Sequence, residues 1–110
     1  MSQAATQAMA IHVDSCAAEE TIVITTRSSV YELVVLRGDR GDALVRGGTH
    51  FTEVTPVLFV GSIADDGSLA RHSIGIGLRM KFVLSDRSVI TSRVQSLSCR
   101  RTLTHDEEER

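Results

Sequence analysis

The chain has 110 residues, of which 12 are basic and 14 are acidic, so its net charge at neutral pH is −2. This length allows one domain with one hydrophobic core, and no apolar run reaches the roughly 18 residues that a membrane-spanning helix requires. Hydrophobic residues make up 42% of the chain. Most of them are Val, Leu and Ile, and side chains branched at Cβ favour strands.

The two ends of the chain differ in composition from its middle. Residues 1–10 are rich in Ala and Gln and are too few to hold a helix alone in water, so we expect a flexible N-terminal arm. The same segment lacks the basic and apolar regions of a signal peptide, which favours a cytoplasmic location. Residues 104–110 contain four consecutive acids and are expected to form a solvated tail. The folded domain is expected at residues 11–103.

Six strand-like segments follow one another inside this domain, and turn-forming residues separate them. The expected strands cover residues 21–27, 30–36, 43–46, 54–60, 78–85 and 88–97. No segment has the length and periodicity of an amphipathic helix. The sequence therefore predicts an all-β fold, namely a small antiparallel barrel or sandwich of about six strands with flexible N- and C-terminal arms.

The loop between the last two expected strands sets their register. In the first of these strands, Met80 and Phe82 share the apolar face. A two-residue loop would place Arg93 opposite Met80 and so put a charge on that face. A three-residue loop at residues 86–88 pairs Phe82 with Ser92 and keeps the face free of charge. We therefore predict the three-residue loop.

The same register gathers three basic residues, Arg79, Lys81 and Arg93, on the opposite face, with Lys81 directly across from Arg93. Like charges that face each other on a sheet are unfavourable unless an acid or an anionic ligand lies between them. The pattern therefore indicates an anion-binding patch for phosphate or nucleic acid. The alternative is a solvated face that nearby acids neutralise. The chain has only one Tyr, three Phe and no Trp, which leaves little for base stacking.

Two expected strands, 30–36 and 54–60, carry apolar residues on both faces, although an antiparallel strand with one face in water should alternate. Apolar surface of this extent usually marks an interface, and a symmetric dimer is the commonest way to cover it. We therefore expect a homo-oligomer. A closed barrel with a thick interior is the competing explanation and would leave a monomer. The interface residues expected on this basis are Val34, Leu36, Val57 and Phe59.

No residues in the sequence have the spacing of a catalytic or metal site. Cys16 and Cys99 belong to no paired motif, and the four histidines are scattered. We predict no metal ligand, cofactor or catalytic residue, and a non-catalytic role is favoured over an enzyme. The sequence thus favours a binding or assembly module that forms a homo-oligomer. The alternative is an anion- or nucleic-acid-binding domain that uses the basic face of Arg79, Lys81 and Arg93.

Overall fold

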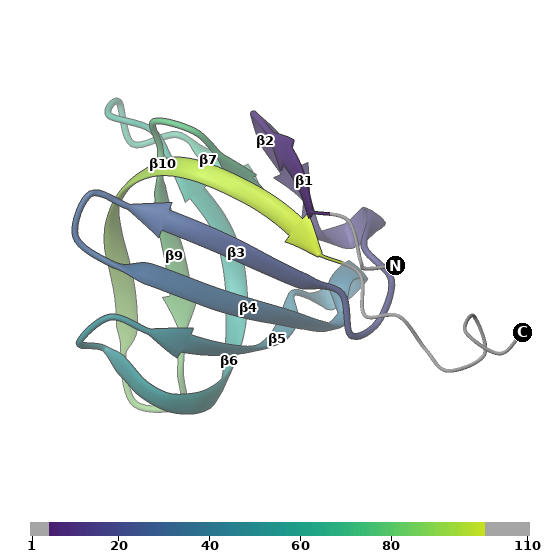
Figure 1. Cartoon of the computed structure of the whole chain (residues 1–110). Helices are drawn as coiled ribbons and strands as arrows, with labels where there is room; N and C mark the ends of the chain where they lie inside the picture. Colours follow the sequence, from purple (N-terminus) through teal and green to yellow (C-terminus); the bar gives the residue numbers. More distant parts are fainter. Residues whose placement is uncertain (1–4, 101–110) are drawn as a thin grey trace, which may run out of the picture.

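The computed structural model describes residues 5–100, which form ten strands and two short 3-10 helices (Figure 1). The elements are β1 (Ala5–Ala8), β2 (Ala10–His12), η1 (Val13–Ser15), β3 (Thr21–Thr26), β4 (Val30–Arg37), η2 (Gly38–Arg40), β5 (Asp42–Gly47), β6 (Phe51–Ile63), β7 (Leu69–Arg71), β8 (Ser73–Gly75), β9 (Arg79–Val83) and β10 (Ser88–Arg100). Within the described residues, no helix is long and apolar enough to cross a membrane.

Six of the strands close into an antiparallel barrel (Figure 1). The order around the ring is β3, β4, β5, β6, β9 and β10, and β10 completes it by pairing with β3. The strands β6 and β10 each have 13 residues and change partners along their length. The first part of β10 pairs with β9, and its last part lies between β3 and β1. The predicted all-β fold is confirmed, and of the two architectures that the sequence left open, a barrel or a sandwich, the structure has the barrel.

The segment expected to be a flexible N-terminal arm contributes strands to the fold instead. Residues Ala5–Ala8 form β1, which pairs antiparallel with the end of β10. The next strand, β2, pairs with β8 to make a separate two-stranded sheet. The physical reason is that β10 extends beyond β9, and the backbone groups along this edge need hydrogen-bond partners. The predicted acidic tail, residues 104–110, lies outside the described residues.

The core fills the interior of the barrel. Buried and less buried residues alternate along β3, β4 and β5, because successive side chains of a strand point to opposite faces. The three phenylalanines of the chain, Phe51, Phe59 and Phe82, are all fully buried. The ring centroid of Phe82 lies 5.5 Å from those of both Phe51 and Phe59. Phe82 is therefore at the centre of the aromatic part of the core.

Two of the four residues expected at an oligomer interface lie inside this core. Val57 is 7% exposed and Phe59 is 0% exposed, so neither can contact a partner. Val34 and Leu36 are on the outer surface. The expectation fails for Val57 and Phe59 because closure of the ring covers the inner face of β6.

The hairpin of β9 and β10 has neither of the two registers considered from the sequence. Phe82 lies opposite Val89, and the loop spans residues 84–87, so it is longer than predicted. The prediction that Phe82 faces Ser92 is therefore wrong. In the observed register Phe82 still faces an apolar residue, Val89. Because more than one register keeps the apolar face apolar, the apolar pattern alone did not decide between them.

A β-bulge in β10 shifts the pairing of β10 with β9 by one residue. The pairing shifts between Ile90 and Arg93, and both Thr91 and Val94 are buried. The hydroxyl of Thr91 accepts a hydrogen bond from the N–H of Met80 at 3.1 Å, so this buried polar side chain is satisfied. A bulge adds a residue to one strand and so changes which side chains point inward beyond it.

Candidate anion-binding site

The bulge in β10 brings two of the predicted basic residues into direct opposition. Arg79 of β9 is the cross-strand partner of Arg93 of β10, and both side chains are exposed. Lys81, expected opposite Arg93, lies opposite Ile90 and is half-buried. The structure thus brings together Arg79 and Arg93 and places Lys81 in the next row of the sheet.

A third arginine, Arg27, joins this pair from the turn between β3 and β4. Its backbone N–H donates to the carbonyl of Arg93 at 3.1 Å. The turn is held by Thr26, whose Oγ1 accepts the backbone N–H groups of Ser28 and Ser29 at 3.3 and 3.1 Å. Sequence reasoning missed Arg27 because its position beside Arg93 depends on the pairing of β3 with β10, which no local pattern encodes.

The turn at residues 75–78 forms a further side of the site. The N–H of Leu78 donates to the carbonyl of Gly75 at 3.2 Å, and Gly77 has a φ of 85°. A turn with a positive φ at its third residue requires glycine there. The N–H of Gly77 in turn donates to the carbonyl of Val94 at 2.8 Å, which fixes the turn against β10.

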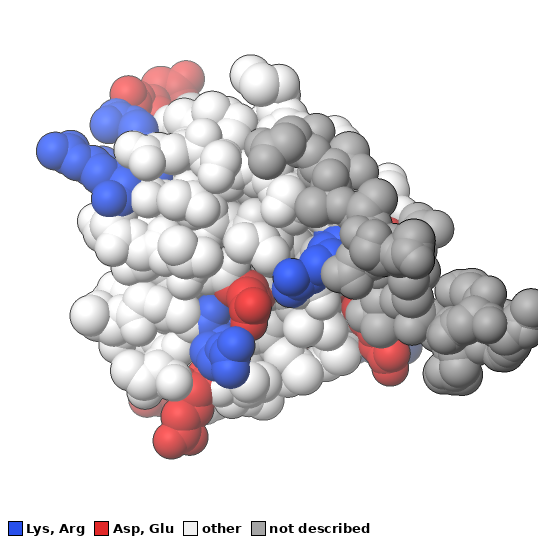
Figure 2. Space-filling model, viewed as in Figure 1, with Lys and Arg blue, Asp and Glu red and all other residues white. Residues whose placement is uncertain are grey.

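These elements enclose a surface hollow of about 700 Å³, which we call the arginine hollow. It is lined by Arg27, Ser28, Ile76, Gly77, Arg79, Ser92, Arg93, Val94 and Gln95. The volume is in the range of small-molecule sites, and the lining combines three guanidinium groups, two hydroxyls and an amide with apolar side chains. In Figure 2, Lys and Arg atoms lie next to Asp and Glu atoms at the upper left, between the turn that joins β3 to β4 and the loop that joins β6 to β7 in Figure 1.

The positive charge of the arginine hollow is only partly neutralised. Nη2 of Arg93 is hydrogen-bonded to Oδ1 of Asp65, and Nη1 of Arg79 donates to the carbonyl of Thr91 at 3.4 Å. Among residues 5–100, neither Arg27 nor Arg79 has an ion-pair partner. Directly opposed arginines repel each other, and one carboxylate offsets only part of this. An anion in the hollow would supply the missing negative charge.

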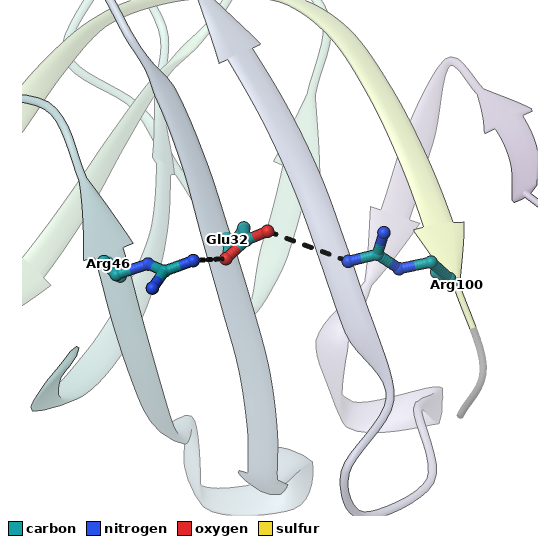
Figure 3. Close-up of polar contacts among 3 residues, drawn as sticks. All are labelled: Glu32, Arg46 and Arg100. Carbon is teal, nitrogen blue, oxygen red and sulfur yellow. Dashed lines mark hydrogen bonds and ion pairs between the residues drawn. The ribbon is translucent and has the colours of Figure 1, made fainter. Parts of the chain in front are cut away.

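Most other arginines of the described chain are paired with acids. Glu32 lies between Arg46 and Arg100, with N–O distances of 2.6 and 3.8 Å, on the outer face of the barrel (Figure 3). Three further exposed pairs are Arg37–Asp39, Arg40–Asp42 and Arg87–Asp86. Within residues 5–100, the cations without an acidic partner are Arg27, Arg71, Arg79 and Lys81. Two of these four line the arginine hollow.

The cysteines do not provide a second candidate site. Oε1 of the buried Glu20 accepts the N–H of Ala17 at 2.7 Å, and Cys99 Sγ lies 3.9 Å from Oε2. Burial and the nearby charge of Glu20 raise the pKa of Cys16 to about 12. Cys16 is therefore a thiol at neutral pH, and a thiol is a poor nucleophile. The described residues also contain no group of three or more His, Cys, Asp or Glu that could hold a metal ion.

The arginine hollow is therefore the best-defined candidate site of the described chain. Known proteins offer no guide to its ligand. Comparisons with family models, with curated proteins and with solved structures find no match. The charge and shape of the hollow between β3, β9 and β10 therefore indicate what it can bind.

Proposed function

We propose that this protein is a non-catalytic binding module whose arginine hollow holds a small anionic ligand, with phosphate as the recognised group. The observation that carries the proposal is the direct opposition of Arg79 and Arg93 beside Arg27, with one carboxylate among three guanidinium groups. Guanidinium groups form paired, charge-assisted hydrogen bonds to phosphate oxygens. A bound phosphate would relieve the repulsion between the arginines.

A small phosphate compound fits the surface better than nucleic acid does. Binding of a nucleic acid draws its affinity from many phosphate contacts, and single strands also stack their bases on aromatic side chains. No aromatic residue lines the arginine hollow. Six of the ten basic residues between positions 5 and 100 are already paired with acids. A long polyanion would therefore find few further contacts beyond the hollow.

Titration with inorganic pyrophosphate, followed by NMR, tests this proposal. We expect backbone signals of residues 27–28, 76–79 and 92–95 to shift. The double variant Arg79→Gln, Arg93→Gln should bind at least about tenfold more weakly, because it loses charged hydrogen bonds worth roughly 1.5–3 kcal/mol each. Arg46→Gln is the matched control, since Arg46 lies on another face and is paired with Glu32.

Two outcomes would contradict the proposal. One is that millimolar pyrophosphate shifts no signals at the arginine hollow, or shifts those around Arg46 equally. The other is that a short DNA or RNA strand binds more tightly than pyrophosphate and loses affinity steeply with added salt, because this dependence is the mark of a polyanion site.

A second candidate function is self-association through the outer face of β4, β5 and β6. Val34 lies opposite Leu44, and Leu44 lies opposite Pro56, so these three form one row across the sheet. Val34 and Leu44 also line a shallow hollow together with Val54. Leu58 is exposed on the same face. A contiguous exposed apolar surface usually marks an interaction site. We call this surface the outer apolar row; it consists of Val34, Leu44, Val54, Pro56 and Leu58. It supports the expectation of a homo-oligomer, with these residues at the interface.

Light scattering coupled to size-exclusion chromatography tests self-association. We expect the wild type to have at least twice the mass of one chain at micromolar concentration. The double variant Val54→Lys, Leu58→Lys should be a monomer, because charges in the outer apolar row cannot be buried without a partner. Met9→Lys is the control, since Met9 is highly exposed but lies outside the row. A wild-type monomer mass across a tenfold dilution would exclude this function.

A further inference from the structure

We infer that Asp65 is a built-in competitor of the ligand: its carboxylate holds Arg93 until a phosphate group displaces it. The inference rests on the proposed function of the arginine hollow and adds how the site is regulated. Asp65 comes from the loop between β6 and β7, while Arg93 comes from β10. The two side chains meet at the rim of the hollow, because Arg93 also lines it.

The ion pair with Arg93 is the one polar contact that the side chain of Asp65 makes within residues 5–100. This side chain is 78% exposed. Exposed ion pairs contribute little to stability, because water screens them and ordering two side chains costs entropy. The pair can therefore open at small cost.

The turn of this loop is held by Asp66, the neighbour of Asp65. Oδ1 of Asp66 accepts hydrogen bonds from the N–H and the hydroxyl of Ser68 at 2.9 and 2.7 Å, and these bonds lower the pKa of Asp66. Backbone bonds from Gly67 to Ala64 and from Ala64 to Ser68 close the same turn. The side chain of Asp65 thus contributes no hydrogen bond to this turn, and its polar contact within residues 5–100 is the one with Arg93.

Phosphate can replace Asp65 because it reaches more of the site. Among the described residues, the carboxylate of Asp65 bonds to Arg93 alone. A phosphate group in the arginine hollow would carry up to two charges and would offer oxygens to the arginines that line it, Arg27, Arg79 and Arg93. Asp65 therefore raises the ligand concentration that is needed to occupy the site. Ligands with one carboxylate gain little by exchanging with it, whereas phosphate compounds gain additional partners.

The variant Asp65→Asn tests this inference, with inorganic pyrophosphate as the probe. We expect Asp65→Asn to bind pyrophosphate about two- to fivefold more tightly than the wild type, which is the range of an exposed ion pair. Asp86→Asn is the matched control: it removes the same charge from an exposed loop, where Asp86 is paired with Arg87 outside the hollow. Its affinity should stay at the wild-type value.

The outcomes separate the inference from the proposed function. If the wild type binds pyrophosphate and Asp65→Asn binds no more tightly than Asp86→Asn, the role of Asp65 is refuted while the arginine hollow remains a binding site. If neither the wild type nor Asp65→Asn binds pyrophosphate, the proposed function is refuted, and the inference with it. A tighter Asp65→Asn complex with signal shifts at Arg93 would support both.

Discussion

Replacing Phe82 with Ala is expected to lower the free energy of unfolding by about 3–5 kcal/mol. Phe82 is fully buried, and its ring lies between those of Phe51 and Phe59. Removal of the ring loses its transfer free energy and leaves a cavity. The surrounding strands form a closed ring and cannot move inward freely to fill the space, so we expect the loss to be at the upper end. Chemical denaturation of the variant and the wild type measures it.

Lys81→Ala is the matched control for this variant. Lys81 is the neighbour of Phe82 in β9, but its side chain points to the opposite, outer face of the sheet. Substitutions of this kind usually change stability by no more than about 0.5 kcal/mol. Similar losses in the two variants would contradict the assignment of inner and outer faces in β9, on which the position of Arg79 at the arginine hollow also depends.

Replacing Gly61 with Ala should also be strongly destabilising. Gly61 has a φ of 151°, and a Cβ at this position would lie 2.3 Å from the carbonyl oxygen of Ala70 and 3.0 Å from Cα of Arg71. Both are backbone atoms of β7, and Gly61 also pairs with Lys81 of β9. Relief of the clash would require β7 to move away from β6. Overpacking and the unfavourable backbone conformation together are expected to cost roughly 2–5 kcal/mol.

Gly67→Ala separates the two contributions. Gly67 also has a positive φ, 88°, but no atom lies within 4 Å of its Cβ position. This variant should therefore lose only the backbone contribution, roughly 1–2 kcal/mol. Thermal or chemical denaturation of both variants gives the comparison. Equal losses at Gly61 and Gly67 would show that β7 does not press against β6 as the structure has it.

The arginine hollow is built on the barrel, which affects how precisely it can hold a ligand. Arg79 and Arg93 project from paired strands, and Arg27 is tied to Arg93 by a backbone hydrogen bond. Sites on strands are held more precisely than sites on loops. Asp65, which we infer to compete with the ligand, is on the loop between β6 and β7. The exposed carboxylate of Asp65 can therefore leave while the backbone that carries the three arginines stays in place.

The sequence by itself determined the class of fold and the faces of individual strands. Alternation in β9 identified Met80 and Phe82 as inward residues and Arg79 as an outward one, because the two-residue period of a strand is a local property. The same local pattern correctly indicated short strands separated by turns. It also placed Arg79 and Arg93 on one basic face, although through a register that the structure does not have.

Only the tertiary structure decided the features that depend on closure of the ring. The bulge before Arg93 lies where β10 leaves β9 and begins to pair with β3, and no pattern within the hairpin indicates it. The same pairing of β3 with β10 brings Arg27 to the arginine hollow. In β6, apolar residues occupy both faces, and closure decides that Phe59 is inside while Leu58 is exposed. Contacts between distant segments set the register, and the register sets which charges meet.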